Sequence, residues 1–246
     1  MVKPNDSMAS GRELSPEMDR LHHRFNSDDW DDIYVIGDVH GCREALGRLL
    51  DTLEPSADDL VVFVGDLIRK GPDSKGVVDL VQARSNVYSV RGNNEQKVID
   101  GRASVDSLTA SDRAYLESLP AVLSWDDVVV VHGGIDHRKP LAEHTLSDLL
   151  NTRSLAASGG YQRPYWFETR REAPRVFFGH TVLAEPFDSE YAVGLDTGCV
   201  YGGQLTAYDY RAGELRGVNP SETHVSRSAD SIVQPRPATS ETYHEL

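Results

Sequence analysis

The chain has 246 residues, with 39 Asp and Glu against 25 Lys and Arg, and its formal net charge is −14. This length suits one large domain or two small ones, and a core of that size needs no disulfide or metal merely to fold. The negative charge repels polyanions and therefore argues against nucleic acid as a partner. The sequence contains no run of about 18 apolar residues, which excludes a helical membrane span and a membrane partner.

Composition also bears on the cellular compartment. The two cysteines, Cys42 and Cys199, are far apart in the sequence and follow no metal-binding pattern, so neither a disulfide scaffold nor a zinc ribbon is expected. The first twenty residues lack the apolar stretch of a signal peptide. We therefore expect a cytoplasmic protein. The excess of acids, with only five lysines, also suits a cytoplasm of high salt concentration.

Both ends of the chain are polar and rich in Pro, Ser and Asp. Residues 1–30 and 218–246 offer too few apolar side chains to offset the entropy that is lost when a chain becomes ordered. We therefore predict disordered extensions at both ends. The region between them, residues 31–217, is then the folded domain, and it contains no internal repeat.

Short apolar runs alternate with helical patterns through residues 31–217. The runs are rich in Val, Ile and Phe, which predicts buried strands. Leu and Val at helical spacing predict two helices, and the stretch after about residue 190 is typical of further strands. Alternation of strand and helix predicts an α/β fold of packed layers, with ligands at the carboxyl ends of the strands. The predicted strands are 33–36, 60–64, 87–90, 128–131 and 176–178, and the predicted helices are 43–53 and 73–84.

A side chain that can bind metal follows each of the five predicted strands. Taken alone, each of these residues is more often a turn former or a solvated side chain. Glycine stands beside all of them, however, and a strand precedes each site, so a chance arrangement is improbable. Histidine, amide and carboxylate ligands suit divalent ions such as Mn²⁺, Fe²⁺, Zn²⁺ or Co²⁺, and six ligands suit a pair of ions. The candidate metal ligands are Asp38, His40, Asp66, Asn93, His132 and His180.

These residues lie in motifs that resemble those of the calcineurin-like metallophosphoesterases. The motifs are GDVHG at 37–41, GD at 65–66, RGNNE at 91–95, HGG at 132–134 and GHT at 179–181. Their form is most similar to the phosphoprotein-phosphatase branch, which includes bacterial and phage-type serine/threonine protein phosphatases and symmetrical dinucleoside tetraphosphatases. The resemblance covers about residues 33–210. It implies a four-layer α/β-β-sandwich with helices on the outer faces, and makes residues 31–217 the catalytic domain.

The resemblance also implies the ligand set of each ion. Asp38, His40 and Asp66 would hold one ion, and Asp66, Asn93, His132 and His180 would hold the second. Mn²⁺ is the expected metal, with Fe, Zn, Co or Ni as alternatives. The implied activity is hydrolysis of a phosphate ester or anhydride by a water that the metals activate.

Two positions depart from the family pattern together. The family usually has Asp-Arg-Gly where this chain has Arg69-Lys70-Gly71, and a His where this chain has Asn94. In the family this Asp and His pair, and the His is thought to protonate the leaving group. A positioned acid supplies about 10²–10⁴-fold when the leaving group needs a proton. We therefore expect a preference for leaving groups of low pKa, such as those of dinucleoside polyphosphates, aryl phosphates or phosphotyrosine.

Other cations could orient the phosphate. Lys70 stands where the family has a phosphate-binding Arg, and Arg69 offers a second charge beside it. Arg153 lies where relatives supply a further phosphate-binding Arg, although it could equally pair with surface acids. His137 is a candidate replacement acid, but an exposed loop histidine is its commoner role.

Three functions remain open at this stage. The leading one is a dimetal phosphohydrolase acting on a small phosphorylated substrate, with a serine/threonine protein phosphatase acting on phosphoproteins as the alternative. A nuclease or phosphodiesterase on the same fold is disfavoured by the acidic charge. A non-catalytic metal-binding regulator is supported only by the missing acid pair, and the filled ligand positions argue against it. The oligomeric state does not follow from the sequence.

Overall fold

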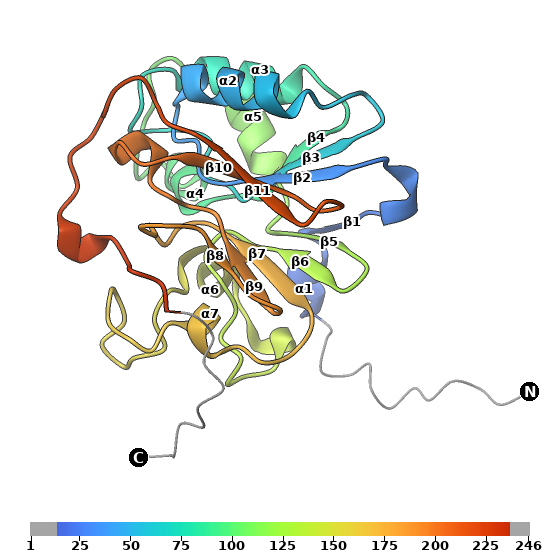
Figure 1. The fold of residues 1–246 in the computed structure, drawn as a ribbon, viewed down its shortest axis with the longest axis vertical. Helices are drawn as coiled ribbons and strands as arrows, with labels where there is room; N and C mark the ends of the chain where they lie inside the picture. The colour runs from blue at the N-terminus through green and yellow to red at the C-terminus, as the bar shows by residue number, and fades with distance from the viewer. Residues whose placement is uncertain (1–13, 237–246) are drawn as a thin grey trace, which may run out of the picture.

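The computed structural model describes residues 14–236, in which two β-sheets pack face to face (Figure 1). One sheet has five strands in the order β11-β10-β2-β3-β4. Its central strands are parallel, so consecutive strands are joined by crossover helices. β10 runs antiparallel to β2 at one side, and β11 completes that edge. The strands are β2 (Ile33–Ile36), β3 (Leu60–Phe63), β4 (Val87–Ser89), β10 (Leu205–Asp209) and β11 (Glu214–Val218).

The other sheet has six strands in the order β1-β5-β6-β7-β9-β8. Parallel pairing joins β6 to β7 and β7 to β9, so the carboxyl ends of these three strands share one edge. Antiparallel β5 and β8 flank them, and β1 pairs with β5. The strands are β1 (His22–Arg24), β5 (Val122–Trp125), β6 (Val128–Val130), β7 (Arg175–Phe178), β8 (Phe187–Asp188) and β9 (Ala192–Gly194).

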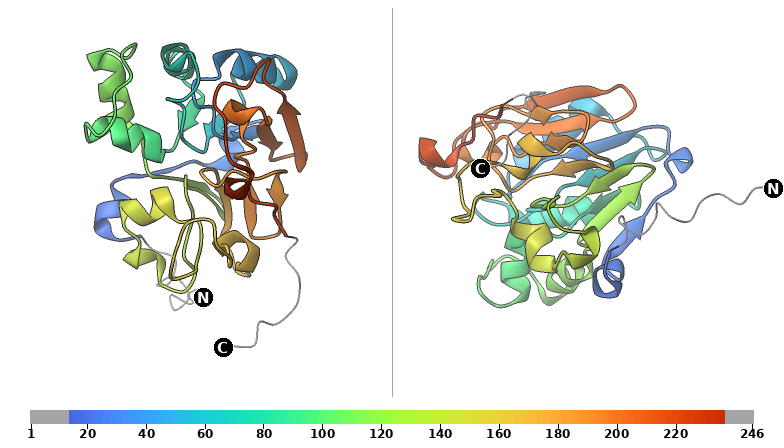
Figure 2. Two further views of the ribbon diagram at one scale, coloured as in Figure 1. Left: turned by 90° about the vertical axis from the view of Figure 1, so that its left-hand side faces the viewer. Right: turned by 90° about the horizontal axis from the view of Figure 1, so that it is seen from below.

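Helices cover the outer face of each sheet, which gives four layers (Figures 1 and 2). The predicted four-layer α/β-β-sandwich is therefore confirmed. Over the five-stranded sheet lie α2 (Arg43–Leu53), α3 (Ser74–Gln82), α4 (Asn93–Ile99) and α5 (Ala110–Ser118). Beside the six-stranded sheet lie α1 (Pro16–Asp19), α6 (Leu146–Asn151) and α7 (Trp166–Thr169).

Alternating side chains of the strands divide between two cores. In β2, Val35 faces the other sheet, whereas Ile36 faces the helices. In β3, Val62 and Phe63 divide in the same way. This period of two follows from the pleat of a strand, and it explains why these runs are apolar throughout. Both faces of the central strands are therefore buried, and this packing holds the ends of the strands in fixed positions.

The predicted extensions at 1–30 and 218–246 are wrong for the parts that the structure describes. Met18 of α1 is 3% exposed, and β1 pairs in parallel with β5. At the other end, residues 219–236 form a segment that we call the C-terminal strap. Val225 packs on the core between the five-stranded sheet and its helices, and Val233 is buried in the core between the six-stranded sheet and its helices. A few apolar anchors thus hold polar segments whose average composition predicts disorder. Residues 1–13 and 237–246 lie outside the described residues.

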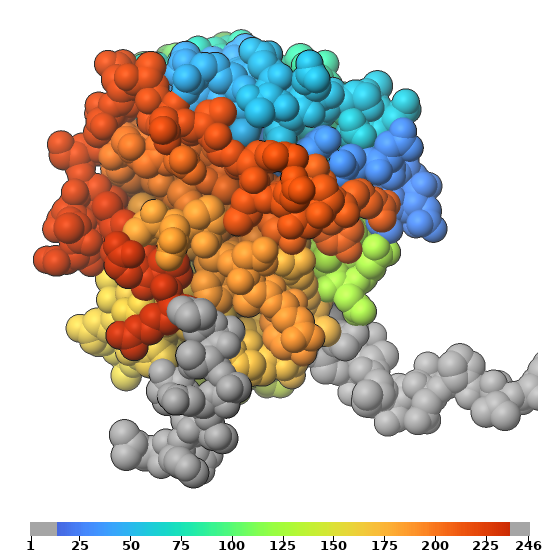
Figure 3. Space-filling view, viewed as in Figure 1, coloured from blue at the N-terminus to red at the C-terminus, as the bar shows by residue number. Residues whose placement is uncertain are grey.

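The strap runs along one side of the molecule, from the helical layer above β11 down to the six-stranded sheet (Figures 2 and 3). Backbone hydrogen bonds fix it at both ends. The N–H groups of His224 and Val225 donate to the carbonyl of Val200, and Val233 exchanges hydrogen bonds with residues 182 and 184. Within residues 14–236, no helix is both long and apolar enough to cross a bilayer.

Candidate metal centre

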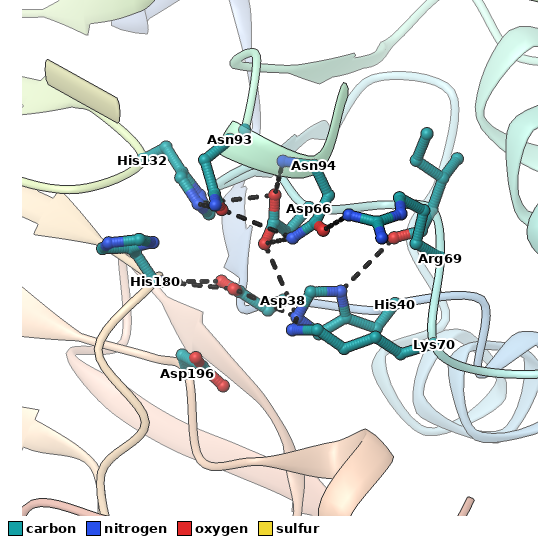
Figure 4. Close-up of polar contacts among 12 residues, drawn as sticks. Asp38, His40, Asp66, Arg69, Lys70, Asn93, Asn94, His132, His180 and Asp196 are labelled. Atoms are coloured by element: carbon teal, nitrogen blue, oxygen red, sulfur yellow. Dashed lines mark hydrogen bonds and ion pairs between the residues drawn. The ribbon is translucent and has the colours of Figure 1, made fainter. Parts of the chain in front are cut away.

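The carboxyl ends of strands from both sheets meet at one edge, where the six predicted ligands gather (Figure 4). Asp38 and His40 follow β2, Asp66 follows β3, and Asn93 starts α4 just after β4. His132 and His180 follow β6 and β7 of the other sheet. The structure thus brings all six together, with Asp66 at the centre of the contacts in Figure 4.

The first group of ligand atoms comes from Asp38, His40 and Asp66. One such atom from each lies within 4.8 Å of the others, and all three residues are buried. His40 Nε2 is 3.5 Å from Asp66 Oδ2 and 3.8 Å from Asp38 Oδ2. The Nδ1 atom of His40 carries the ring proton, because it faces the carbonyl of Ile68 at 3.3 Å and donates to it. Nε2 therefore presents a lone pair toward two carboxylates, an arrangement that a cation stabilises.

The second group forms around the other oxygen of Asp66. His132 Nδ1 donates to the carbonyl of Val64 at 2.8 Å, so His132 Nε2 is an acceptor. This Nε2 lies 3.4 Å from Asp66 Oδ1 and 3.1 Å from the amide oxygen of Asn93. Three acceptor atoms, one each from His132, Asp66 and Asn93, then face one another without a hydrogen between them. The opposite amide orientation of Asn93 would let its nitrogen donate to His132 and Asp66, with its oxygen accepting from Lys97.

His180 completes the cluster from β7. Its backbone N–H lies 3.2 Å from both carboxylate oxygens of Asp38, and its ring meets His132 edge to face with centroids 5.0 Å apart. The Nε2 atom of His180 accepts from Arg153. Imidazole nitrogens together with carboxylate and amide oxygens are the ligands that divalent Mn, Fe or Zn ions take. The donor set therefore fits divalent ions, and its six members are enough for two.

The histidines are in the neutral form that metal ligands need. Burial lowers the pKa of His40 to about 3. Burial also lowers the pKa of His132, and burial followed by the neighbouring His132 and Arg153 lowers that of His180 well below its usual value. In contrast, burial and the nearby Asp196 carboxylate raise the pKa of Asp38 well above its ordinary range. The neutral histidines and the raised pKa of Asp38 together show that the centre has an excess of negative charge, which a cation would offset.

Backbone strain is concentrated at this edge. Of the seven non-glycine residues with positive φ among residues 14–236, five belong to the cluster. The left-handed turn at His40 (φ 50°) aims its ring beside Asp38. Such conformations persist only where the surrounding structure holds them. The five are His40, Asp66, Arg69, Lys70 and His180.

Two glycines are required by close approach of the ligand carboxylates. A Cβ on Gly92 would overlap the Asp66 carboxylate, and a Cβ on Gly179 would overlap Asp38 Oδ1. This accounts for the glycine beside these ligands in the sequence.

Glu95 of the RGNNE motif fixes the loops rather than facing the ligands. Its fully buried carboxylate accepts from the N–H groups of Asp66 at 2.9 Å, Gly92 at 2.8 Å and Ile68 at 3.2 Å. Burial and the nearby charge of Asp66 raise the pKa of Glu95 to about 8. Because it ties the loop after β3 to the start of α4, Glu95 sets the distance between Asp66 and Asn93.

The two departures from the family motifs form one contact. Arg69 NH1 donates to Asn94 Oδ1 at 2.6 Å. The Asn94 backbone N–H lies 2.8 Å from Asp66 Oδ1, and its side-chain nitrogen donates to the other oxygen of Asp66. Arg69 and Asn94 thus meet beside the central carboxylate, where the resemblance expects an Asp–His pair.

Lys70 and Arg153 reach the cluster from opposite sides. Lys70 Nζ lies 2.7 Å from His40 Nε2, and an Arg153 NH2 lies 2.8 Å from His180 Nε2. Arg153 also donates to the carbonyl of His180 at 3.1 Å. Both predicted phosphate-binding cations are therefore at the centre.

His137 is not brought to the cluster. It lines a separate hollow with Arg138, Arg170 and Glu172 that extends to Pro174, which precedes β7, whereas His180 follows the other end of that strand. The structure gives no contact that supports its suggested role as replacement acid, which stays a prediction. Its alternative, an exposed loop histidine, is confirmed for the loop but not for the exposure, because the ring is half-buried.

Three residues beside the centre are not among the predicted site residues. Asp196 follows β9 as the other acids follow their strands; it is 2% exposed and close to Asp38 (Figure 4). That strand-end position was a usable signal. Arg227 and Tyr161 carried none, because Arg227 lies in the polar strap and Tyr161 in a loop. Arg227 donates to the hydroxyl of Tyr161, and Arg153 lies over the ring of the same tyrosine.

Comparison with known proteins agrees with this geometry. The family model "Calcineurin-like phosphoesterase" matches residues 32–192. A serine/threonine-protein phosphatase 1 from Salmonella typhimurium is 31% identical over 218 residues, covering 78% of this chain and 97% of the relative. A bis(5'-nucleosyl)-tetraphosphatase PrpE from Oceanobacillus iheyensis is 28% identical, covering 76% of this chain and 91% of the relative. That relative is of the asymmetrical type, whereas the motifs had suggested the symmetrical one.

A solved structure gives the same result. The crystal structure of a candidate diadenosine tetraphosphatase superposes with a TM-score of 0.72 at 28% identity, covering 80% of this chain and 97% of that one. The family model, the two relatives and the solved structure thus agree on one family and one fold. The chain belongs to the calcineurin-like phosphoesterases and is a metallophosphoesterase, a hydrolase of phosphate esters.

Proposed function

We propose that this hydrolase holds two divalent ions, Mn²⁺ first among them, and prefers substrates whose leaving group has a low pKa. Asp38, His40 and Asp66 would hold one ion. Asp66 would be shared with a second ion on Asn93, His132 and His180. The mutual facing of lone pairs across Asp66 supports this assignment. Dinucleoside polyphosphates, aryl phosphates and phosphotyrosine are the proposed substrate class.

A pair of divalent ions supplies a nucleophile from water at neutral pH and positive charge against the phosphoryl oxygens. The chain supplies the rest. Lys70 and Arg153 now donate to histidine lone pairs that a filled centre would use, so in the filled centre both cations are free to bind the phosphoryl oxygens. Arg153 offers a planar fork, whereas Lys70 is a point charge. Together they orient the phosphorus and offset the charge that develops on it.

The proposed substrate preference rests on the contact between Arg69 and Asn94. An amide has no proton to give at neutral pH, and a guanidinium stays charged. The pair therefore cannot protonate an alkoxide leaving group, but Arg69 can stabilise a leaving group that departs as an anion. A phosphate or a phenolate departs in this way, whereas the alkoxide of serine needs a proton.

A serine/threonine protein phosphatase is the second candidate. The name and 31% identity of the Salmonella relative favour it. A panel of substrates separates the two: diadenosine tetraphosphate, a nucleoside triphosphate, p-nitrophenyl phosphate, and phosphotyrosine and phosphoserine peptides, with Mn²⁺ and with Asp66→Ala as blank. Faster hydrolysis of the anhydrides and aryl esters supports the proposal. Faster release from phosphoserine would replace it with the second candidate.

Restoring the family pair tests the cause of the preference. In the double variant Arg69→Asp, Asn94→His, we expect kcat/KM for the phosphoserine peptide to rise at least about tenfold relative to that for diadenosine tetraphosphate, because a positioned acid is worth about 10²–10⁴-fold. The single variants Arg69→Asp and Asn94→His serve as controls, since either residue alone lacks its partner. A double variant that binds Mn²⁺ as tightly as the parent without this gain would refute the explanation.

A further inference from the structure

Three cations and two tyrosines alternate around the metal centre. Lys70 Nζ lies over the Tyr201 ring, 5.2 Å from its centroid. Arg227 lies between the two tyrosines, 4.6 Å from the centroid of the Tyr201 ring and 5.5 Å from that of the Tyr161 ring. Arg153 lies over Tyr161 at 4.5 Å. We call these five residues the cation–tyrosine arc. Its two ends reach His40 and His180, the first through Lys70 and the second through Arg153.

The cations of the arc have no acid partner. Among residues 14–236, no carboxylate lies within 4.0 Å of the charged nitrogens of Lys70, Arg153 or Arg227. Elsewhere in this acidic chain, arginines such as Arg163 and Arg216 pair with glutamates. Burial of Arg153 beside Tyr161, with its Nε unpartnered, is costly unless an anion compensates for it. The nearest acids, Asp38 and Asp196, belong to the metal centre and interact with these cations only at longer range. Divalent ions would neutralise those acids, so three cations without a direct ion pair on one rim favour a ligand with several negative charges.

Arg227 has the capacity to bind such a ligand. Its Nε donates to the carbonyl of Ser231 at 2.9 Å, and one NH2 hydrogen goes to the Tyr161 hydroxyl. The other three N–H groups of the guanidinium have no partner in the described residues. Contact with two aromatic rings orders the side chain in advance, which lowers the entropy lost on binding.

Arg227 also lies farther from the metal centre than Lys70 and Arg153 do. Lys70 and Arg153 touch histidines of the metal centre, whereas the contacts of Arg227 are with Tyr161, Tyr201 and its own strap. A phosphoryl group at the metals is therefore within reach of the inner two cations. The next phosphate of a chain would meet Arg227.

We propose that Arg227 is a specificity-determining residue that binds the phosphate beyond the scissile one, so that the arc selects a polyphosphate chain over a single phosphate. This rests on the proposed function and narrows it to nucleoside or dinucleoside polyphosphates. The C-terminal strap places the residue, since it is fixed to Val200 on one side of Arg227 and to Val182 on the other.

The test compares Arg227→Ala with Arg216→Ala, which removes the same charge from exposed β11. Calorimetry at fixed free Mn²⁺ measures binding of inorganic tripolyphosphate and of orthophosphate. For Arg227→Ala we expect tripolyphosphate to bind about 10–100-fold more weakly and orthophosphate less than about threefold more weakly, as one charge-assisted hydrogen-bonded contact predicts. KM for diadenosine tetraphosphate should rise while KM for p-nitrophenyl phosphate does not. Arg216→Ala should match the parent throughout.

Equal losses for both anions, or none, would overturn the proposal. If Arg227→Ala lowers the thermal midpoint, Arg227→Lys and Tyr161→Phe replace it, and both should weaken tripolyphosphate selectively. The binding arm is independent of the leaving group. Selective loss of tripolyphosphate in an enzyme that prefers phosphoserine would therefore refute the proposed function alone, and unselective loss in an enzyme that prefers anhydrides would refute the role of Arg227 alone.

Discussion

At the scale of single residues, Lys70 approaches His40, which is a proposed metal ligand, and is itself a proposed phosphate-binding cation. Its Nζ lies 2.7 Å from His40 Nε2, where it competes with an ion for one lone pair. We predict that Lys70→Met leaves Mn²⁺ affinity unchanged or raises it, because a competing cation is lost. KM for phosphorylated substrates should rise about 10–100-fold with the loss of a charge-assisted contact.

Mn²⁺ titration by calorimetry and steady-state kinetics measure the two effects of Lys70→Met separately. Lys75→Met on α3 is the matched control, because Lys75 pairs with the exposed Asp79 and lies outside the cluster. If Lys70→Met abolished Mn²⁺ binding, Lys70 would instead be holding the ligands in place.

The gathering of the six proposed ligands at one edge could be predicted because each follows an apolar strand, and the ends of parallel strands share an edge. The same logic covers Asp196 after β9. Arg227 could not be found in this way. Its place depends on long-range contacts of the strap, such as Val225 and Val233 with separate cores, and no local pattern encodes them.

At the scale of elements, the turn after β7 passes so close to β2 that Gly179 has no room for a side chain. In Gly179→Ala, the new Cβ must displace the Asp38 carboxylate. We predict a loss of kcat/KM on the order of 10²-fold, the cost of a displacement of about 1 Å at a reacting centre, together with weaker Mn²⁺ binding.

Gly47→Ala in α2 is the control for that substitution. Its new Cβ would meet only the flexible end of Arg43, and alanine in a helix interior is favoured by roughly 0.5–1 kcal/mol. It should therefore unfold at a slightly higher temperature with unchanged activity. Parent-like activity in Gly179→Ala would show that Asp38 has room to move.

Glu95 joins two elements through three backbone N–H groups. In Glu95→Gln, one acceptor oxygen becomes an NH₂ that faces other donors. We predict a decrease of roughly 1–3 kcal/mol in the free energy of unfolding, the cost of buried unsatisfied groups, measured by urea titration. Glu117→Gln, at an exposed position of α5, should change it by less than about 0.5 kcal/mol. If the two variants lowered the free energy of unfolding equally, the hydrogen bonds of Glu95 would not be what joins the two elements.

The elements themselves were predictable to different degrees. α2 and β2 have the predicted bounds, since each carries a long or strongly apolar pattern. β1, with the sequence His-His-Arg, was missed because it is polar and gains its place by pairing with β5. α4 was missed because Asn93 and Asn94 are weak helix formers, and Glu95 stabilises its first turn.

At the scale of the whole molecule, the metal centre lies where two sheets end, and the C-terminal strap spans both. Val225 packs on the core of the five-stranded sheet and Val233 on that of the six-stranded sheet, with Arg227 between them. The strap therefore depends on both halves of the fold for its position. Loosening one anchor should free the arginine without touching the metal ligands.

Val233→Asp makes this testable, because Val233 is 4% exposed and a carboxylate there would be buried without a partner. We predict a loss of roughly 1–3 kcal/mol in the free energy of unfolding, and a fall in the preference for tripolyphosphate over orthophosphate toward that of Arg227→Ala. Ala229→Asp adds the same charge at an exposed position of the strap and should change neither quantity. Urea titration and calorimetry at fixed free Mn²⁺ provide the two measurements. A destabilised Val233→Asp that kept its full preference would mean that the tyrosines alone hold Arg227 in place.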